Sequence, residues 1–190
     1  MSPRFLLFLA LIIVQLAVPS YMIHREERVL AHGKVFRFRT APFDPYDPFR
    51  GRYVALRFAS EEIADPKLPE GTRKVWVELE EDRDGFAKVK GVSETRPPGE
   101  NVMKAAFTPK RLTFPFNRYY MDEAAAPAVQ QAYGDHTKSG DAYVVVRILD
   151  GHAVLQELFI GGMPIREFLS KDSVGAFKPR PSPGTNSSGH

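Results

Sequence analysis

The sequence predicts a mainly β protein: an antiparallel sandwich or barrel-like domain with one short helix, preceded by an N-terminal transmembrane helix. Three observations lead to this fold class. Residues 5–23 form an uncharged apolar run. After residue 34, apolar and polar residues alternate with a period of two in several segments, as in half-buried strands. Two pairs of these segments are joined by Asp-Gly dipeptides, which favour tight hairpin turns.

The apolar run FLLFLALIIVQLAVPSYMI predicts a single-pass membrane anchor within residues 1–24. At about 1.5 Å per helical residue it spans roughly 28 Å, close to the ~30 Å hydrocarbon layer of a bilayer. A cleaved signal peptide is the alternative, but Pro19 disfavours a small-x-small cleavage site. Under either interpretation, the very short basic segment before the run places everything after His24 outside the cytoplasm.

The remaining chain divides into three parts by composition. The charged residues 25–33 are expected to form a juxtamembrane linker with a short helical continuation. Residues 34–170 are expected to form the β domain. Residues 171–190 are rich in proline, glycine and serine and are predicted to be a disordered tail, because they cannot bury enough apolar surface to fold.

Two strands are expected on either side of a proline-rich loop, at residues 34–40 and 52–58. Their apolar residues recur at alternate positions, so each strand should turn one face to the core. The predicted core faces consist of Phe36, Phe38 and Thr40 in the first strand and of Val54, Leu56 and Phe58 in the second.

Two hairpins follow, one over residues 75–90 with a turn at Asp84-Gly85 and one over residues 143–160 with a turn at Asp150-Gly151. The second hairpin is rich in valine, leucine and isoleucine and should lie near the centre of its sheet. A further short strand is expected at residues 111–116. The one helix of the domain is predicted from Asp122 to Tyr133, where Asp122 can cap its start and Gly134 can end it.

Composition and motif searches narrow the classes of function. The chain has no cysteine, which removes disulfides, thiol nucleophiles and cysteine-ligated zinc. Its 26 basic and 23 acidic residues are interspersed, so no basic stripe indicates nucleic-acid binding. The five histidines do not have metal-ligand spacing, and the Walker A, GxSxG and HExxH patterns are absent. We therefore expect no cofactor, no metal and no nucleic-acid partner.

The loop between the first two strands contains the most distinctive polar residues, Asp44 and Asp47, each before a proline and close to Arg50 and Arg52. Asp-Pro is a favoured turn start, so a structural role is expected first and a partner-binding loop second. General acid–base chemistry or a hard cation would also use paired carboxylates, but two are too few for a calcium cage.

Arginines are densest in the same part of the chain, at positions 37, 39, 50, 52 and 57. If their strands paired, Arg37 and Arg39 would lie near Arg57 and form a patch for phosphate groups or an acidic partner. Cross-strand neutralisation by acidic residues such as Glu61, Glu62, Glu78 and Glu80 is the expected alternative.

The order of these features resembles a known family. Thr40-Ala41-Pro42-x-Asp44-Pro45, then Arg50-Gly51-x-Tyr53-x-x-Leu56-x-Phe58, the aromatic segment from Phe116 to Tyr120 and the closing hairpin around Asp150-Gly151 are similar to the bacterial GDYXXLXY proteins. The chain departs from the signature at Arg52, in place of aspartate, and at Phe58, in place of tyrosine. An arginine can only donate hydrogen bonds, so an acid–base role of the signature aspartate would be lost here.

The resemblance implies a membrane-anchored protein of the bacterial inner membrane with its C-terminal domain in the periplasm, linked to polytopic membrane proteins. We expect a non-catalytic accessory or binding domain that contacts a membrane-protein partner or an envelope ligand. An envelope hydrolase using Asp44 and Asp47 is the alternative, and a purely structural spacer is a third hypothesis. The candidate partner-binding residues are Asp44, Asp47, Arg50, Gly51, Arg52, Tyr53, Leu56 and Phe58.

Overall fold

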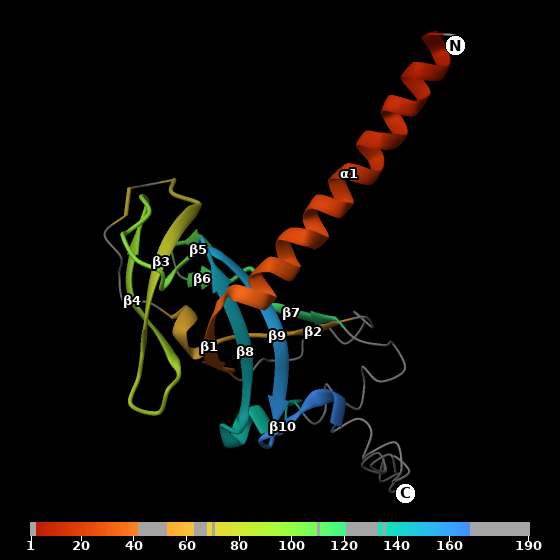
Figure 1. Cartoon of the computed structure of the whole chain (residues 1–190). Helices are drawn as coiled ribbons and strands as arrows, with labels where there is room; N and C mark the ends of the chain where they lie inside the picture. Colours follow the sequence, from red (N-terminus) through yellow and green to blue (C-terminus); the bar gives the residue numbers. More distant parts are fainter. Residues whose placement is uncertain are drawn as a thin grey trace, which may run out of the picture.

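The computed structural model describes residues 3–41, 53–62, 68–69, 71–109, 111–120, 133–134 and 136–167. A 30-residue helix, α1 (Pro3–His32), projects from a body of antiparallel strands that form three sheets (Figure 1). The predicted fold class, mainly antiparallel β after a long N-terminal helix, is confirmed. Of the helix expected from Asp122 to Tyr133, only Tyr133 is described, and Gly134, which was expected to end the helix, is itself helical. The expected tail over residues 171–190 lies wholly outside the described residues.

The first sheet has the strand order β1-β8-β9-β10. It consists of β1 (Lys34–Arg39), β8 (Ala142–Leu149), β9 (His152–Ile160) and β10 (Met163–Pro164). The hairpin predicted at Asp150-Gly151 is confirmed, and φ angles of 51° and 81° at these residues are those of a tight primed turn. As expected for its valine-rich sequence, β8 lies inside the sheet, between β1 and β9.

The second sheet has the order β4-β3-β5-β6. It consists of β3 (Lys74–Glu81), β4 (Ala87–Ser93), β5 (Val102–Thr108) and β6 (Arg111–Thr113). The predicted first hairpin is confirmed, and the Asp82 carboxylate stabilises its turn by accepting bonds from the Asp84 and Phe86 N–H groups at 2.9 and 2.8 Å. Sequence reasoning missed β5, whose Lys-Ala-Ala centre has weak β-propensity.

The third sheet pairs two short strands, β2 (Tyr53–Ala55) and β7 (Arg118–Tyr120). The strand expected over residues 52–58 is thus shorter than predicted: after Ala55 the chain leaves β2, makes an isolated bridge from Phe58 to Thr40, and enters the 3₁₀ turn η1 (Ala59–Glu61). The strand expected at 111–116 also ends early, at Thr113.

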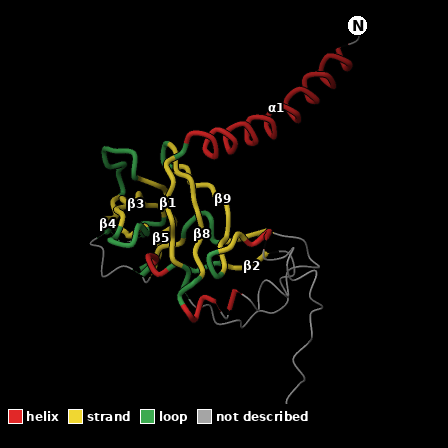
Figure 2. Tube along the Cα trace, turned by 60° about the horizontal axis from the view of Figure 1, so that its bottom comes forward, coloured by secondary structure: helices red, strands yellow, loops and turns green. Residues whose placement is uncertain are grey.

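The strands lie together in one body, from which α1 projects (Figure 2). The buried residues between the sheets form a core that is rich in aromatic rings. Phe38, Phe58, Phe114 and Phe116 pack with ring centroids 5.0–5.9 Å apart, mostly in tilted or edge-to-face arrangements that aromatic pairs prefer. The predicted core face of β1 is confirmed, because Phe36, Phe38 and Thr40 are all buried. The predicted core face of the next segment is confirmed for Leu56 and Phe58, whereas the Val54 side chain lies outside the described residues.

Helix α1 joins the β domain without an intervening coil. The helix runs through the expected juxtamembrane segment to His32, and β1 starts at Lys34. Of the residues in α1, all of which the structure describes, Val29 alone is buried. The Gly33 N–H donates to the Val29 carbonyl at 2.8 Å, and the Arg147 guanidinium donates to the Gly33 carbonyl at 3.2 Å. A Cβ atom at residue 33 would lie 2.5 Å from the Val29 oxygen, so glycine is required at this junction.

Candidate functional site

The signature segment is described only in its second half. Asp44, Asp47, Arg50, Gly51 and Arg52 lie outside the described residues, and Tyr53 is described in its backbone alone, which pairs with Tyr120. Leu56 and Phe58 are 3% and 2% exposed. The buried Leu56 and Phe58 of the signature therefore belong to the core.

Phe58 shows how this packing works. Its ring centroid lies 5.9 Å from that of Phe38, 5.7 Å from Phe114 and 5.2 Å from Phe116, so three elements meet at one side chain. The backbone bridge from Phe58 to Thr40 then brings the two ends of the loop together. The described segments on either side of residues 42–52 are thus joined beside the core.

Buried polar side chains lie beside these loop ends. The Thr40 hydroxyl donates to the Ala142 carbonyl at 2.8 Å and lies 3.4 Å from the Thr137 hydroxyl. Tyr133 is 4% exposed, and burial raises the pKa of its phenol, an effect that the nearby Thr40 and Thr137 hydroxyls oppose. No hydrogen bond of standard geometry joins the Tyr133 hydroxyl to the part of the chain that the structure describes.

Glu61 is a buried carboxyl group that sequence reasoning treated only as a surface charge. It is 3% exposed and accepts a bond of 3.4 Å from the Phe114 N–H group. Burial raises the pKa of the Glu61 carboxyl, and the Phe114 N–H and the Arg111 guanidinium oppose this rise. A perturbed acid can indicate a functional site. Here, however, the carboxyl satisfies a backbone donor next to the aromatic core, and this contact supports a structural role.

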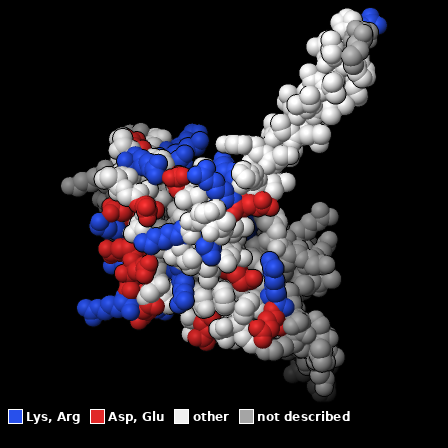
Figure 3. All heavy atoms as spheres, viewed as in Figure 1, with Lys and Arg blue, Asp and Glu red and all other residues white. Residues whose placement is uncertain are grey.

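The arginine patch considered for residues 37, 39 and 57 does not form by strand pairing. Strand β1 pairs with β8, and Thr40–Phe58 is the one described bridge between the two segments. Arg39 instead donates to Asp84 at 2.6 Å and lies 4.1 Å from the centroid of the Phe86 ring. Lys90 pairs with Glu78 at 2.5 Å. Basic and acidic side chains are interspersed over the face of the β domain that Figure 3 shows. This distribution agrees with the alternative in which acidic residues neutralise the arginines.

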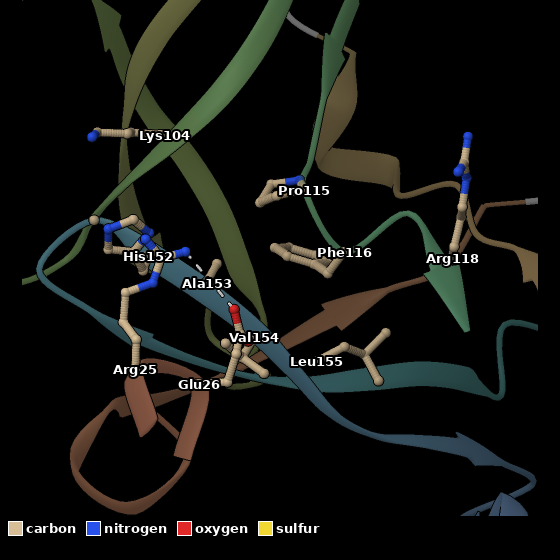
Figure 4. Close-up of a pocket in the computed structure, with 11 residues that line it drawn as sticks. Arg25, Glu26, Lys104, Pro115, Phe116, Arg118, His152, Ala153, Val154 and Leu155 are labelled. Carbon is tan, nitrogen blue, oxygen red and sulfur yellow. Dashed lines mark ion pairs between the residues drawn. The ribbon is translucent and has the colours of Figure 1, made fainter. Parts of the chain in front are cut away.

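A pocket of about 350 Å³ lies where α1 meets the β domain. Figure 4 shows the Arg25 side chain extending from α1 toward His152 at the start of β9, with Lys104 of β5 on the same side; Arg118 lies at the opposite end. Pro115, Phe116, Ala153, Val154 and Leu155 provide apolar lining. The lining residues include three Lys or Arg side chains and one carboxylate, Glu26.

The pKa of His152 reflects the charges that line this pocket. The pKa of its imidazole is lowered, first by partial burial and then by the charges of Arg25 and Lys104, which Glu26 and Asp150 partly offset. The imidazole is therefore largely neutral at pH 7. The two cations near His152, Arg25 and Lys104, favour an anion at this end of the pocket.

A larger groove of about 710 Å³ adjoins the pocket, because Lys104 and Pro115 line both. Trp76 of β3, the single tryptophan, lies half-buried in this groove. The Lys104 ammonium lies 5.0 Å and the Arg96 guanidinium 5.5 Å from its ring centroid. The ring also covers Gly151, where a Cβ atom would lie 2.4 Å from Trp76 Cζ3.

These pocket residues were not predicted from the sequence, since they come from four separate segments. Arg25 belongs to the expected linker and Lys104 to the strand that was missed. Their proximity depends on β5 meeting the β8–β9 turn, where the Lys104 N–H donates to the Gly151 carbonyl at 3.1 Å. Within the described residues, no group of three His, Asp or Glu side chains could hold a metal ion.

Fold and anchor together define a class: a mainly β domain attached to a single helix that is long and apolar enough to cross a membrane. The chain belongs to the GDYXXLXY protein family, whose model matches residues 15–158. Comparisons with curated proteins and with solved structures give no significant match.

Proposed function

We propose that this protein is a non-catalytic accessory domain that α1 holds at the periplasmic face of the bacterial inner membrane, where its signature loop contacts a polytopic membrane-protein partner. One observation carries the proposal: α1 enters β1 through a single glycine that is bonded on both sides. Such a joint fixes the direction of the domain relative to a membrane helix. A fixed orientation lowers the entropic cost of binding a neighbour in the same membrane.

The organisation around the loop supports the same function. Thr40 and Phe58, on either side of the loop, bridge each other beside the aromatic core, so a contact made by the loop would be presented from a rigid base. Loops on rigid scaffolds are frequent sites of recognition. The candidate contact residues are Asp44, Asp47, Arg50, Arg52 and Tyr53.

Photo-crosslinking in native membranes tests this proposal. A photoreactive amino acid is placed at residue 47 in the loop and, as a control, at Lys88, which is exposed on β4. The expected result is a discrete crosslink to one membrane protein from residue 47 and none from residue 88. Equal or no adducts at both positions would contradict a partner-binding loop.

The rigid joint allows a second, sharper test. A flexible Gly-Ser insertion between His32 and Lys34 should reduce the crosslink from residue 47, because the domain would lose its fixed orientation. The same insertion at Gly99, where a Cβ atom would have nothing within 4 Å, is the matched control and should leave the crosslink intact. A crosslink that survives both insertions would show that orientation by α1 is unnecessary.

A further inference from the structure

We propose that the pocket at the base of α1 binds the phosphate group of a membrane-lipid headgroup, with Arg25 and Lys104 as its cationic side chains and the His152 imidazole beside them. The pocket volume of about 350 Å³ lies within the range of roughly 300–1,000 Å³ typical of small-molecule sites. The proposal uses the membrane placement of α1 from the proposed function and is otherwise independent of any partner.

The position of the pocket along α1 favours a lipid. The uncharged run ends at Ile23, and Arg25 follows within one helical turn. If this run fills the hydrocarbon layer, Arg25 and the pocket that it lines lie at the level of the headgroups. An anionic headgroup would then reach the pocket from the same leaflet without leaving the bilayer.

The side chains at the Arg25 end have the chemistry that phosphate requires. A guanidinium can donate two parallel bonds to phosphate oxygens, and an ammonium group adds a point charge. The competing pair is weak: Arg25 and Glu26 are neighbours in α1, their charged atoms are 4.0 Å apart, and their side chains are 42% and 51% exposed. Exposed pairs of this kind contribute little, so Glu26 does not satisfy Arg25.

The opposite wall of the pocket suits a lipid better than free phosphate. The Phe116 ring lies against the middle of the pocket in Figure 4, between the basic end and Leu155. Ala153, Val154 and Leu155 of β9 extend this apolar surface. A molecule with an anionic head and an apolar body can contact both walls, whereas inorganic phosphate can use only the basic end.

Binding is measured with the full chain in a non-ionic detergent by calorimetry. Three titrants are compared: short-chain phosphatidylglycerol, short-chain phosphatidylcholine and inorganic phosphate. Trp76 fluorescence locates the site, because the single indole lies next to Lys104. We expect saturable binding of phosphatidylglycerol, several-fold weaker binding of the other two and a change in Trp76 emission.

Charge-removing variants identify the side chains. Arg25→Gln and Lys104→Gln should each weaken phosphatidylglycerol binding by about fivefold or more, as expected for charged hydrogen bonds to phosphate. Lys88→Gln removes the same charge from the distant strand β4 and should leave the affinity unchanged. An equal loss in all three variants would overturn the assignment, because it would reflect net charge alone.

The pH dependence of the lipid affinity gives an independent test of the site. Arg25, Glu26, Lys104 and Asp150 are the charged groups that influence His152, and the lowered pKa of this imidazole keeps it neutral at pH 7. An anion favours the protonated ring, so affinity should rise as pH falls from 8 to 5.5, and His152→Gln should reduce this rise. A pH dependence unchanged in His152→Gln would remove His152 from the site.

The outcomes separate the two proposals. Inorganic phosphate that binds as tightly as phosphatidylglycerol would keep the anion site but reject a lipid as its ligand. No heat and no fluorescence change at millimolar titrant would overturn the site altogether. Because the titration takes place in detergent without any partner, its failure would leave the accessory function untouched, and a missing crosslink from the loop would leave the pocket untouched.

Discussion

Two regions of the β domain differ in almost every property. The region around Phe58 is a buried aromatic cluster, in which Phe58 is 2% exposed and the neighbouring Glu61 is 3% exposed. The region at the base of α1 is an open pocket with three Lys or Arg side chains in its lining. The residues that give the family its name therefore stabilise the fold where the structure describes them, and the basic pocket lies elsewhere.

The largest expected effect comes from the aromatic cluster. Phe58→Ala should lower the free energy of unfolding by about 3–5 kcal/mol, because it leaves a cavity among three rings. Denaturant unfolding of the full chain in detergent measures this. Phe58→Leu keeps most of the apolar volume and should cost clearly less. An equal loss of unfolding free energy in Phe58→Ala and Phe58→Leu would show that the apolar volume at residue 58 does not stabilise the cluster.

Gly151 links the pocket to the sheet and allows a matched comparison. Gly151 and Gly140 have φ angles of +81° and +80°, but only Gly151 lies under the Trp76 ring, whereas nothing lies within 4 Å of a Cβ atom at Gly140. Gly140→Ala should cost about 1–2 kcal/mol from its left-handed backbone. Gly151→Ala should cost about 1–3 kcal/mol more from overpacking, and it should also shift Trp76 emission. An equal loss of stability in Gly140→Ala and Gly151→Ala would show that the Trp76 ring moves aside freely.

Two substitutions of Glu61 separate the contribution of its hydrogen bond from that of its charge. Glu61→Ala removes the acceptor of the Phe114 N–H group and should cost about 1–3 kcal/mol. Glu61→Gln keeps a carbonyl acceptor and removes the charge.

The pH dependence of this pair follows from the raised pKa of Glu61 in the folded state. The stabilising contribution of the protonated acid is complete below the unfolded value near 4.5 and declines as pH rises through the folded pKa. The stability of Glu61→Gln relative to the unmodified chain should therefore increase from pH 4 to pH 8. Thermal unfolding at both pH values measures this difference, and a difference independent of pH would show that burial does not perturb Glu61.

The smallest effect is expected at the surface. Arg39 and Asp84 are 2.6 Å apart, but their side chains are 42% and 68% exposed. Asp84→Asn should therefore change the free energy of unfolding by less than about 1 kcal/mol, and added salt should reduce the effect further. A cost as large as that of Glu61→Ala would mean that this exposed pair organises the β3–β4 turn.

Local patterns predicted most of the fold. The two Asp-Gly hairpins, the core face of β1 and the apolar helix depend on residues close in sequence, and each is present. Strand β5 was missed because its stability comes from pairing with β3 and β6 rather than from its own propensities. The expected pairing of the segments that contain Arg37, Arg39 and Arg57 is limited to the Thr40–Phe58 bridge, and β1 pairs along its length with β8, more than 100 residues away, a choice that no local pattern specifies.

The pocket at the base of α1 was not predicted for the same reason. Arg25, Lys104 and His152 are each unremarkable charged or polar residues within their own segments. They meet only because α1 packs on the first sheet while the β8–β9 turn contacts β5. Sequence reasoning located the signature loop as the candidate site, and the structure leaves that prediction untested.

The central claim is that α1 holds the β domain outside the cytoplasm and remains attached. The chain has no cysteine, so a single Asp84→Cys substitution in the exposed β3–β4 turn gives one labelling site without background. Spheroplasts are treated with a membrane-impermeant maleimide, and the membranes are then washed with carbonate. The account predicts labelling before lysis, with all labelled protein in the washed membranes. Labelling only after lysis would place the domain in the cytosol, and labelled protein in the soluble fraction would show that the helix is cleaved.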